Sequence, residues 1–105
     1  MLLVVAVLVV LCLVVFLYWR NTVHKVILFR SDDCPVCQDL KRDVWPKLVS
    51  AFPSIEFQEV DCTIAKEVAL QYGIHAYPTI MLVRDDVSVY SGEWTVDAIS
   101  KAIKA

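Results

Sequence analysis

The sequence predicts an α/β fold with elements in the order β-α-β-α-β-β-α, preceded by one N-terminal transmembrane helix. Three observations lead to this prediction. An uninterrupted apolar run covers residues 2–19, whereas roughly half of the other residues are apolar, as in an ordinary globular domain. Segments with strand and helix periodicity then alternate along the chain. A Cys-x-x-Cys motif, Cys34 to Cys37, lies between the first strand and the helix that follows it.

The N-terminal apolar run has the length of a membrane span. Its eighteen residues rise roughly 27 Å as a helix, close to the thickness of the hydrocarbon core. Phe16, Tyr18 and Trp19 stand at its end, where aromatic side chains favour the membrane interface, and Arg20 follows. A cleaved signal peptide is the alternative, but it requires a basic residue before the apolar core and small residues at the cleavage site, and this segment has neither.

These features divide the chain of 105 residues into an anchor (1–20), a linker (21–22) and one small domain (23–105). The basic residues nearest the anchor, which include Lys25 and Arg30, all follow it. Because positive charge is enriched on the cytoplasmic side, we expect a single-pass membrane protein whose domain faces the cytoplasm.

The first half of the domain predicts a strand, a helix and a second strand. Val23–Phe29 ends in a continuous apolar run, which is typical of a strand buried on both faces. Apolar residues at steps of four predict a helix over 35–52, which Pro46 should kink because proline lacks an N–H. Ile55–Asp61 is the second strand, and a β-α-β unit implies parallel pairing.

The second half predicts a helix, a hairpin and a final helix. Thr63–Tyr72 has helical periodicity, and the glycine after it suits the helix C-terminus. Thr79–Arg84 and Val87–Tyr90 form an antiparallel hairpin around two aspartates. Thr95 can cap the last helix.

Charge and cysteine content exclude several classes of protein. The net charge is −2, and the sequence has no basic stripe with interleaved aromatics, so nucleic acid is not an expected partner. Four cysteines are too few for a disulfide scaffold.

The Cys-x-x-Cys motif predicts redox chemistry. Cys34 would lie at the N-terminus of a helix, where unpaired N–H groups stabilise a thiolate, and Pro35 suits the first helical position. Cys34 would therefore be the nucleophile that attacks a disulfide, and Cys37 would resolve the mixed disulfide.

Two segments resemble the thioredoxin-like superfamily over nearly all of residues 23–105. One is the strand followed by the cysteine pair, VILFRSDDCPVCQDL, and the other is QYGIHAYPTI at residues 71–80. The Tyr-Pro-Thr-Ile sequence is similar to that of protein disulfide isomerase domains, whereas Cys-Pro-x-Cys is closer to glutaredoxins. Ser91-Gly92 before the last helix also matches the family pattern.

The resemblance implies a thioredoxin-like sandwich that exchanges disulfides of protein substrates. It implies that Pro78 is cis, faces Cys34 and belongs to the catalytic group, and that the Tyr77 backbone pairs with the substrate chain. Pro35 and Val36, between the two cysteines, are further candidates for substrate contact.

Several positions depart from the family pattern. Where thioredoxins carry a buried carboxylate six residues before the first cysteine, this chain has Leu28, so no obvious base deprotonates Cys37. Asp33 replaces the usual tryptophan; with Asp32 it should raise the pKa of the Cys34 thiol and favour a basic substrate surface. His75 is a second candidate for tuning Cys34, although a solvated loop position is the simpler interpretation.

The expected partners follow from this chemistry. The redox-active Cys34–Cys37 disulfide needs no cofactor, but it needs a reductase or a sulfhydryl oxidase to restore it. Glutathione is not an expected partner, because Ala76-Tyr77-Pro78 and a lone Gly92 replace the residues with which glutaredoxins hold it. The direction of electron flow stays open.

Two other functions stay open. The domain could be a docking module at a membrane with little turnover. The cysteine pair could also bind a metal, for which Cys62 and His75 are the other candidate donors, but these two lack a second paired spacing. A buried structural thiol is the simpler interpretation of Cys62, and a small apolar residue that of Cys12.

Overall fold

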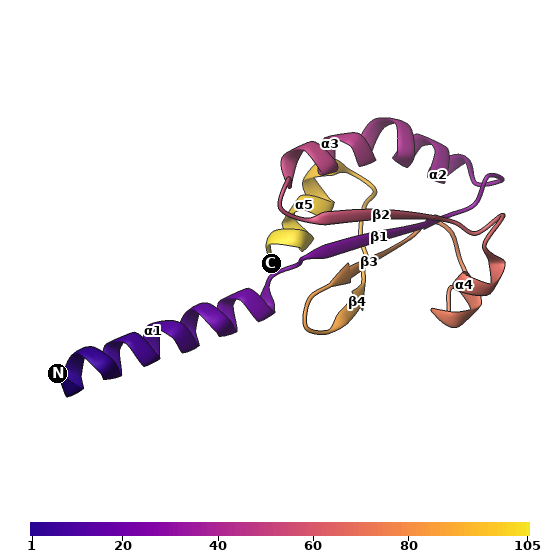
Figure 1. The fold of residues 1–105 in the computed structure, drawn as a ribbon. Helices are drawn as coiled ribbons and strands as arrows, with labels where there is room; N and C mark the ends of the chain where they lie inside the picture. The colour runs from indigo at the N-terminus through magenta and orange to yellow at the C-terminus, as the bar shows by residue number, and fades with distance from the viewer.

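The computed structural model describes residues 1–105, except for the side chains of residues 19–21. Its elements, labelled in Figure 1, are α1 (Leu2–Asn21), β1 (Lys25–Arg30), α2 (Pro35–Asp39), the π-helical turn η1 (Leu40–Val44), α3 (Trp45–Ala51), β2 (Glu56–Asp61), α4 (Lys66–Gln71), β3 (Thr79–Val83), β4 (Val87–Val89) and α5 (Val96–Lys104). After α1, this is the predicted order of strands and helices.

The strands form one mixed sheet in the order β2-β1-β3-β4. β1 pairs with β2 in parallel and with β3 antiparallel, and β4 completes the hairpin at the edge. The parallel pair and the antiparallel hairpin are those that the sequence predicts. The helices α2, α3 and α5 cover one face of the sheet, and α4 lies on the other (Figure 1).

The central strand β1 is buried on both of its faces. Val26 and Leu28 belong to the larger core cluster, under α3 and α5, whereas Ile27 and Phe29 belong to the smaller cluster, with Ala69 of α4. Successive side chains of a strand point to opposite faces, so the continuous apolar run supplies both clusters at once. The prediction of a doubly buried strand is confirmed.

Proline interrupts the predicted helix over 35–52. Residues 35–51 are helical in three consecutive parts, α2, η1 and α3, and the π-helical turn ends two residues before Pro46. The N–H of Trp45 donates to the carbonyl of Leu40, five residues back, which is the spacing of a π-turn. The expected disturbance at Pro46 therefore takes the form of a π-helical turn.

The helix α4 is shorter than predicted. It begins at Lys66, because the backbone of Ala65, with φ −101° and ψ 58°, is not helical. Asp61 holds a separate turn before it: its carboxylate accepts from the N–H of Thr63 at 3.0 Å and its carbonyl from the N–H of Ala65 at 2.9 Å. Ile64, which lies in the part of the predicted helix that precedes α4, is 84% exposed. Gly73 ends the helix as predicted, with φ +68°.

The final helix agrees with its prediction. The hydroxyl of Thr95 accepts from the N–H of Ala98 at 3.1 Å and so caps α5. Ile99 and Ile103 of this helix are buried in the larger cluster. The guanidinium of Arg84, after β3, donates to the carbonyl of Ala102 at 2.9 Å and ties the end of α5 to the sheet.

The structure contradicts the predicted membrane anchor. Among the residues that it describes, no helix is both long and apolar enough to cross a membrane. The transmembrane helix, the single-pass localisation and the cytoplasmic placement of the domain are therefore corrected. The side chains of Trp19 and Arg20, on which the interface argument depended, lie outside the described residues.

A core substitution tests this packing. Leu48 of α3 is fully buried in the larger cluster, so Leu48→Ala is expected to lower the free energy of unfolding by about 2–5 kcal/mol. Urea denaturation followed by circular dichroism measures this loss. The neighbouring Val49 is exposed, and Val49→Ala should change the stability by no more than about 0.5 kcal/mol. Equal losses in the two variants would contradict the packing.

Candidate functional site

The two cysteines of the Cys-x-x-Cys motif lie at the junction of β1 and α2. Cys34 is the N-cap of α2 and Cys37 lies in its first turn. They are within disulfide-bonding distance, with their Cα atoms 5.2 Å apart. Cys34 is half-buried, whereas Cys37 is only 1% exposed. A partner can therefore reach the first sulfur much more readily than the second.

The helix supplies a hydrogen bond to the more accessible sulfur. The N–H of Cys37 donates to Sγ of Cys34 at 3.1 Å. Pro35 follows the cap at the first helical position, where its missing N–H leaves no donor unpaired. An amide donor at this sulfur stabilises a thiolate once the disulfide is reduced.

The loop before β3 faces the cysteine pair. The Tyr77–Pro78 peptide is cis, as the family resemblance implies. The carbonyl oxygen of Tyr77 lies 3.7 Å from Sγ of Cys34. The hydroxyl of Thr79 donates to the carbonyl of Ala76 at 2.7 Å and closes the loop. The polar backbone of Tyr77 thus lies next to the sulfur of Cys34, the more accessible of the two sulfurs.

The two aspartates before Cys34 have different surroundings. Asp32 forms an ion pair with Arg30 at 3.0 Å, so the guanidinium compensates its charge. Burial alone would lower the pKa of the Arg30 guanidinium. The hydrogen bond and the charge of Glu59, together with Asp61 and Asp32, outweigh burial and raise this pKa. Asp33 is exposed and has no ion pair with the described residues. The uncompensated negative charge beside Cys34 is therefore that of Asp33.

A groove beside the cysteine pair was not predicted from the sequence. It is a cavity of about 420 Å³ between α4 and the Tyr77 loop, with Asp33, Thr63 and Lys66 among its lining residues. Cys62, also in its lining, is 3% exposed, which agrees with a buried structural thiol. Burial raises the pKa of the Cys62 thiol, and a hydrogen bond from Tyr77 partly offsets this effect.

The other candidate residues lie apart from the two sulfurs or on the surface. Leu28 is fully buried in the larger cluster, so an apolar side chain occupies the position of the family's carboxylate. His75 is exposed, and among the described residues no contact joins it to either cysteine. Val36 is exposed beside Cys34, where a substrate could touch it.

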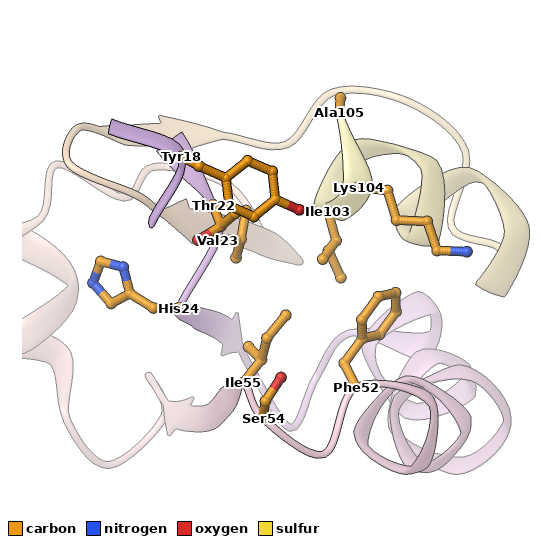
Figure 2. A pocket seen from close by; sticks show the side chains of 10 residues that line it. All are labelled: Tyr18, Thr22, Val23, His24, Phe52, Ser54, Ile55, Ile103, Lys104 and Ala105. Carbon is orange, nitrogen blue, oxygen red and sulfur yellow. The ribbon is translucent and has the colours of Figure 1, made fainter. Parts of the chain in front are cut away.

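A larger cavity lies at the other end of the domain. It measures about 760 Å³ and is bordered by the end of α1, the start of β1 and the end of α5. Figure 2 shows Tyr18 above the apolar side chains of Ile55 and Ile103, with His24 and Lys104 at opposite sides. Its lining contains no cysteine, so this cavity is separate from the Cys34–Cys37 site.

The metal alternative requires a cluster of ligands. Within the described part of the chain, no group of three or more His, Cys, Asp or Glu side chains could hold a metal ion. Cys62 and His75, the additional donors that this alternative needs, do not join the cysteine pair in such a group.

Comparison with known proteins decides the family. The family model described as Thioredoxin matches residues 17–105. The chain belongs to the thioredoxin family. Its cysteine pair, at the strand–helix junction, lies within the residues that the family model matches.

This thioredoxin-family chain is similar to several known proteins and solved structures. It is 38% identical over 80 residues to Bloodstream-specific protein 2 of Trypanosoma brucei brucei, covering 73% of the chain but only 16% of that longer protein. Among solved structures, mitochondrial thioredoxin 3 from Saccharomyces cerevisiae in its oxidised form superposes with a TM-score of 0.67 at 25% identity, covering 83% of this chain and 82% of that one. Fasciola hepatica thioredoxin gives a TM-score of 0.68 at 23% identity and 88% coverage of each chain, which shows the shared fold.

The difference in environment between the cysteines predicts their reactivity. In a reduced Cys12→Ala variant treated with iodoacetamide near neutral pH, Cys34 should be alkylated first. Cys62 should react at least about tenfold more slowly, because it is buried and its thiol pKa is raised by burial. Peptide mapping by mass spectrometry measures both rates. In concentrated guanidinium chloride the difference should vanish; equal rates in the folded protein would contradict the buried position of Cys62.

Proposed function

We propose that this thioredoxin-family protein exchanges the disulfides of protein substrates through Cys34 and Cys37. The observation that supports this most is the position of Cys34: its sulfur is accessible, lies 3.7 Å from the carbonyl of Tyr77, and adjoins a groove. An extended polypeptide can pair with backbone groups such as those of Tyr77 as an added strand does.

The surface around Cys34 also suits a polypeptide. Val36, two residues after Cys34, and Tyr77, whose carbonyl lies 3.7 Å from the sulfur, have exposed side chains, and Leu70 in the lining of the groove is also exposed. Asp33 adds a negative charge without an ion-pair partner among the described residues. We therefore expect substrates that carry apolar residues around the reactive cysteine and a basic residue near it.

In the reducing direction, the thiolate of Cys34 attacks one sulfur of the substrate disulfide. A mixed disulfide forms and the other substrate sulfur leaves as a thiolate. Cys37 then loses its proton and attacks Sγ of Cys34, which releases the second substrate thiolate and closes the Cys34–Cys37 disulfide. Two electrons pass to the substrate, whose thiolates take up the protons of the two cysteines. Oxidation of a substrate dithiol is the reverse sequence.

Leu28 makes the proton transfer from Cys37 the difficult step. No carboxylate occupies this position, and Cys37 is shielded from water. The nearest base at that moment is the substrate thiolate just released, since an ordinary thiol has a pKa near ~8.5 and a thiolate accepts a proton readily. In this proposal the substrate itself deprotonates Cys37, and no cofactor takes part.

Variants of the two cysteines test the proposal. With dithiothreitol as electron donor, the full chain should reduce insulin, and Cys34→Ser should lower this rate by more than about 100-fold, because the nucleophile is lost. Cys37→Ser should also lose turnover, but it should trap a mixed disulfide that a non-reducing gel detects. Cys12→Ser is the matched control and should leave the rate unchanged.

The same experiment separates the docking alternative. If the unmodified chain reduces no protein disulfide and Cys34→Ser binds partners as well as the unmodified chain does, the domain is a docking module.

Equilibration of the Cys34–Cys37 pair with glutathione buffers gives the direction of electron flow. A potential near about −270 mV indicates a reductase, and one of about −120 to −180 mV indicates an oxidase or isomerase.

A further inference from the structure

The residue two positions before Cys34 is held at each of its polar groups. The N–H of Asp32 donates to the hydroxyl of Thr63 at 2.9 Å. Its carbonyl accepts from the side-chain amide of Gln38 at 3.2 Å, and its carboxylate accepts from Arg30 at 3.0 Å. These three partners come from the end of β1, from α2 and from the segment after β2. Asp32 is therefore fixed from three sides.

Two of these partners are themselves fixed to β2. The side chain of Arg30 is only 13% exposed, and its Nε donates to Glu59 at 2.8 Å, while Asp61 lies 3.7 Å from its Nη1. The N–H of Thr63 donates to the carboxylate of Asp61 at 3.0 Å. The contacts to Asp32 thus connect the segment before Cys34 to the neighbouring strand.

The fixed residue belongs to a tight turn that ends at the nucleophile. The N–H of Cys34 donates to the carbonyl of Ser31 at 3.2 Å, which closes a turn over residues 31–34. The hydroxyl of Ser31 also lies 3.4 Å from that of Thr63. Thr63 therefore contacts two residues of this turn, and the turn sets where Sγ of Cys34 lies relative to the amide of Cys37 and the carbonyl of Tyr77.

We propose that Thr63 is a positioning residue for the redox pair: through its hydroxyl it holds the turn 31–34, so that the Cys34 sulfur stays on the amide of Cys37. This inference deepens the proposed function and rests on it. The contact matters most after reduction, because the disulfide no longer fixes the position of Cys34, which then depends on the turn and on its hydrogen bonds to α2. Neither Thr63 nor Gln38 touches a reacting atom in this proposal.

Substitution of the hydroxyl by a methyl group tests the proposal. In the full chain, Thr63→Val keeps the size of the side chain and removes both contacts, whereas Thr63→Ser keeps the hydroxyl. Thr95→Val is the matched control, because it also removes a hydrogen bond between a threonine hydroxyl and a backbone N–H, but at the cap of α5. Two quantities are measured: the rate of alkylation of reduced Cys34 by iodoacetamide, by peptide mapping, and the equilibrium of the pair with glutathione.

Loss of a hydrogen bond of this kind corresponds to about a 2- to 10-fold change in each quantity. We expect Thr63→Val to slow the alkylation of Cys34 and to shift the equilibrium towards the disulfide by this factor. Thr63→Ser should behave as the unmodified chain does. Thr95→Val should lower the midpoint of thermal unfolding and move neither quantity.

Two results would overturn the proposal. One is a Thr63→Val variant with unchanged rate and equilibrium. The other is a Thr63→Ser variant as impaired as Thr63→Val, because the hydroxyl would then not be the active group. Both measurements use only glutathione and iodoacetamide, so they decide the role of Thr63 even if the chain reduces no protein disulfide. A chain that reduces no protein disulfide would instead refute the proposed function.

Discussion

The burial of β1 on both faces is the constraint on which the rest of the structure depends. The strand pairs with β2 on one side and with β3 on the other, and its side chains enter both core clusters. The end of such a strand has little freedom, so the turn that follows it begins from a fixed point. Cys34 lies four residues beyond Arg30, the last residue of the strand, and the position of the nucleophile thus depends on the packing of the sheet.

Beyond the end of β1, polar contacts rather than apolar packing hold the chain in place. Arg30 turns its guanidinium to Asp32, Glu59 and Asp61, and Thr63 and Gln38 hold the backbone of Asp32. Several of these groups are exposed to solvent, where single ion pairs and hydrogen bonds contribute little to stability. Their value here is geometric, because three weak contacts from three elements leave one residue few alternative conformations. The negative charge of Asp32 is also compensated, which leaves Asp33 as the charge that a substrate meets.

The sequence predicts the parts of this structure that depend on local patterns. The apolar run before Arg30 predicts the doubly buried strand, and Thr95 and Gly73 mark ends of helices through capping chemistry that involves only near neighbours. The cysteine pair was placed correctly between strand and helix. The predicted start of α4 was wrong because the backbone of Ala65 is not helical, so the turn that Asp61 holds does not continue into α4.

The contact of Thr63 with Asp32 spans 31 positions in the sequence, and no local pattern reveals such a pair. The membrane prediction failed for a different reason. It rested on the length of an apolar run whose rise of roughly 27 Å is only marginally sufficient for a hydrocarbon core of ~30 Å.

The two faces of the sheet also separate the thiols. Cys37 is carried by α2, which lies with α3 on one face, whereas Cys62 belongs to the cluster under α4 on the other (Figure 1). Disulfide exchange requires a thiolate to approach the sulfur that it attacks, and Cys62 is only 3% exposed. Burial also raises the pKa of the Cys62 thiol, which favours its protonated form over the thiolate. A third cysteine can therefore lie in the lining of the groove without competing with Cys37 for the mixed disulfide, which would otherwise divert the substrate from release.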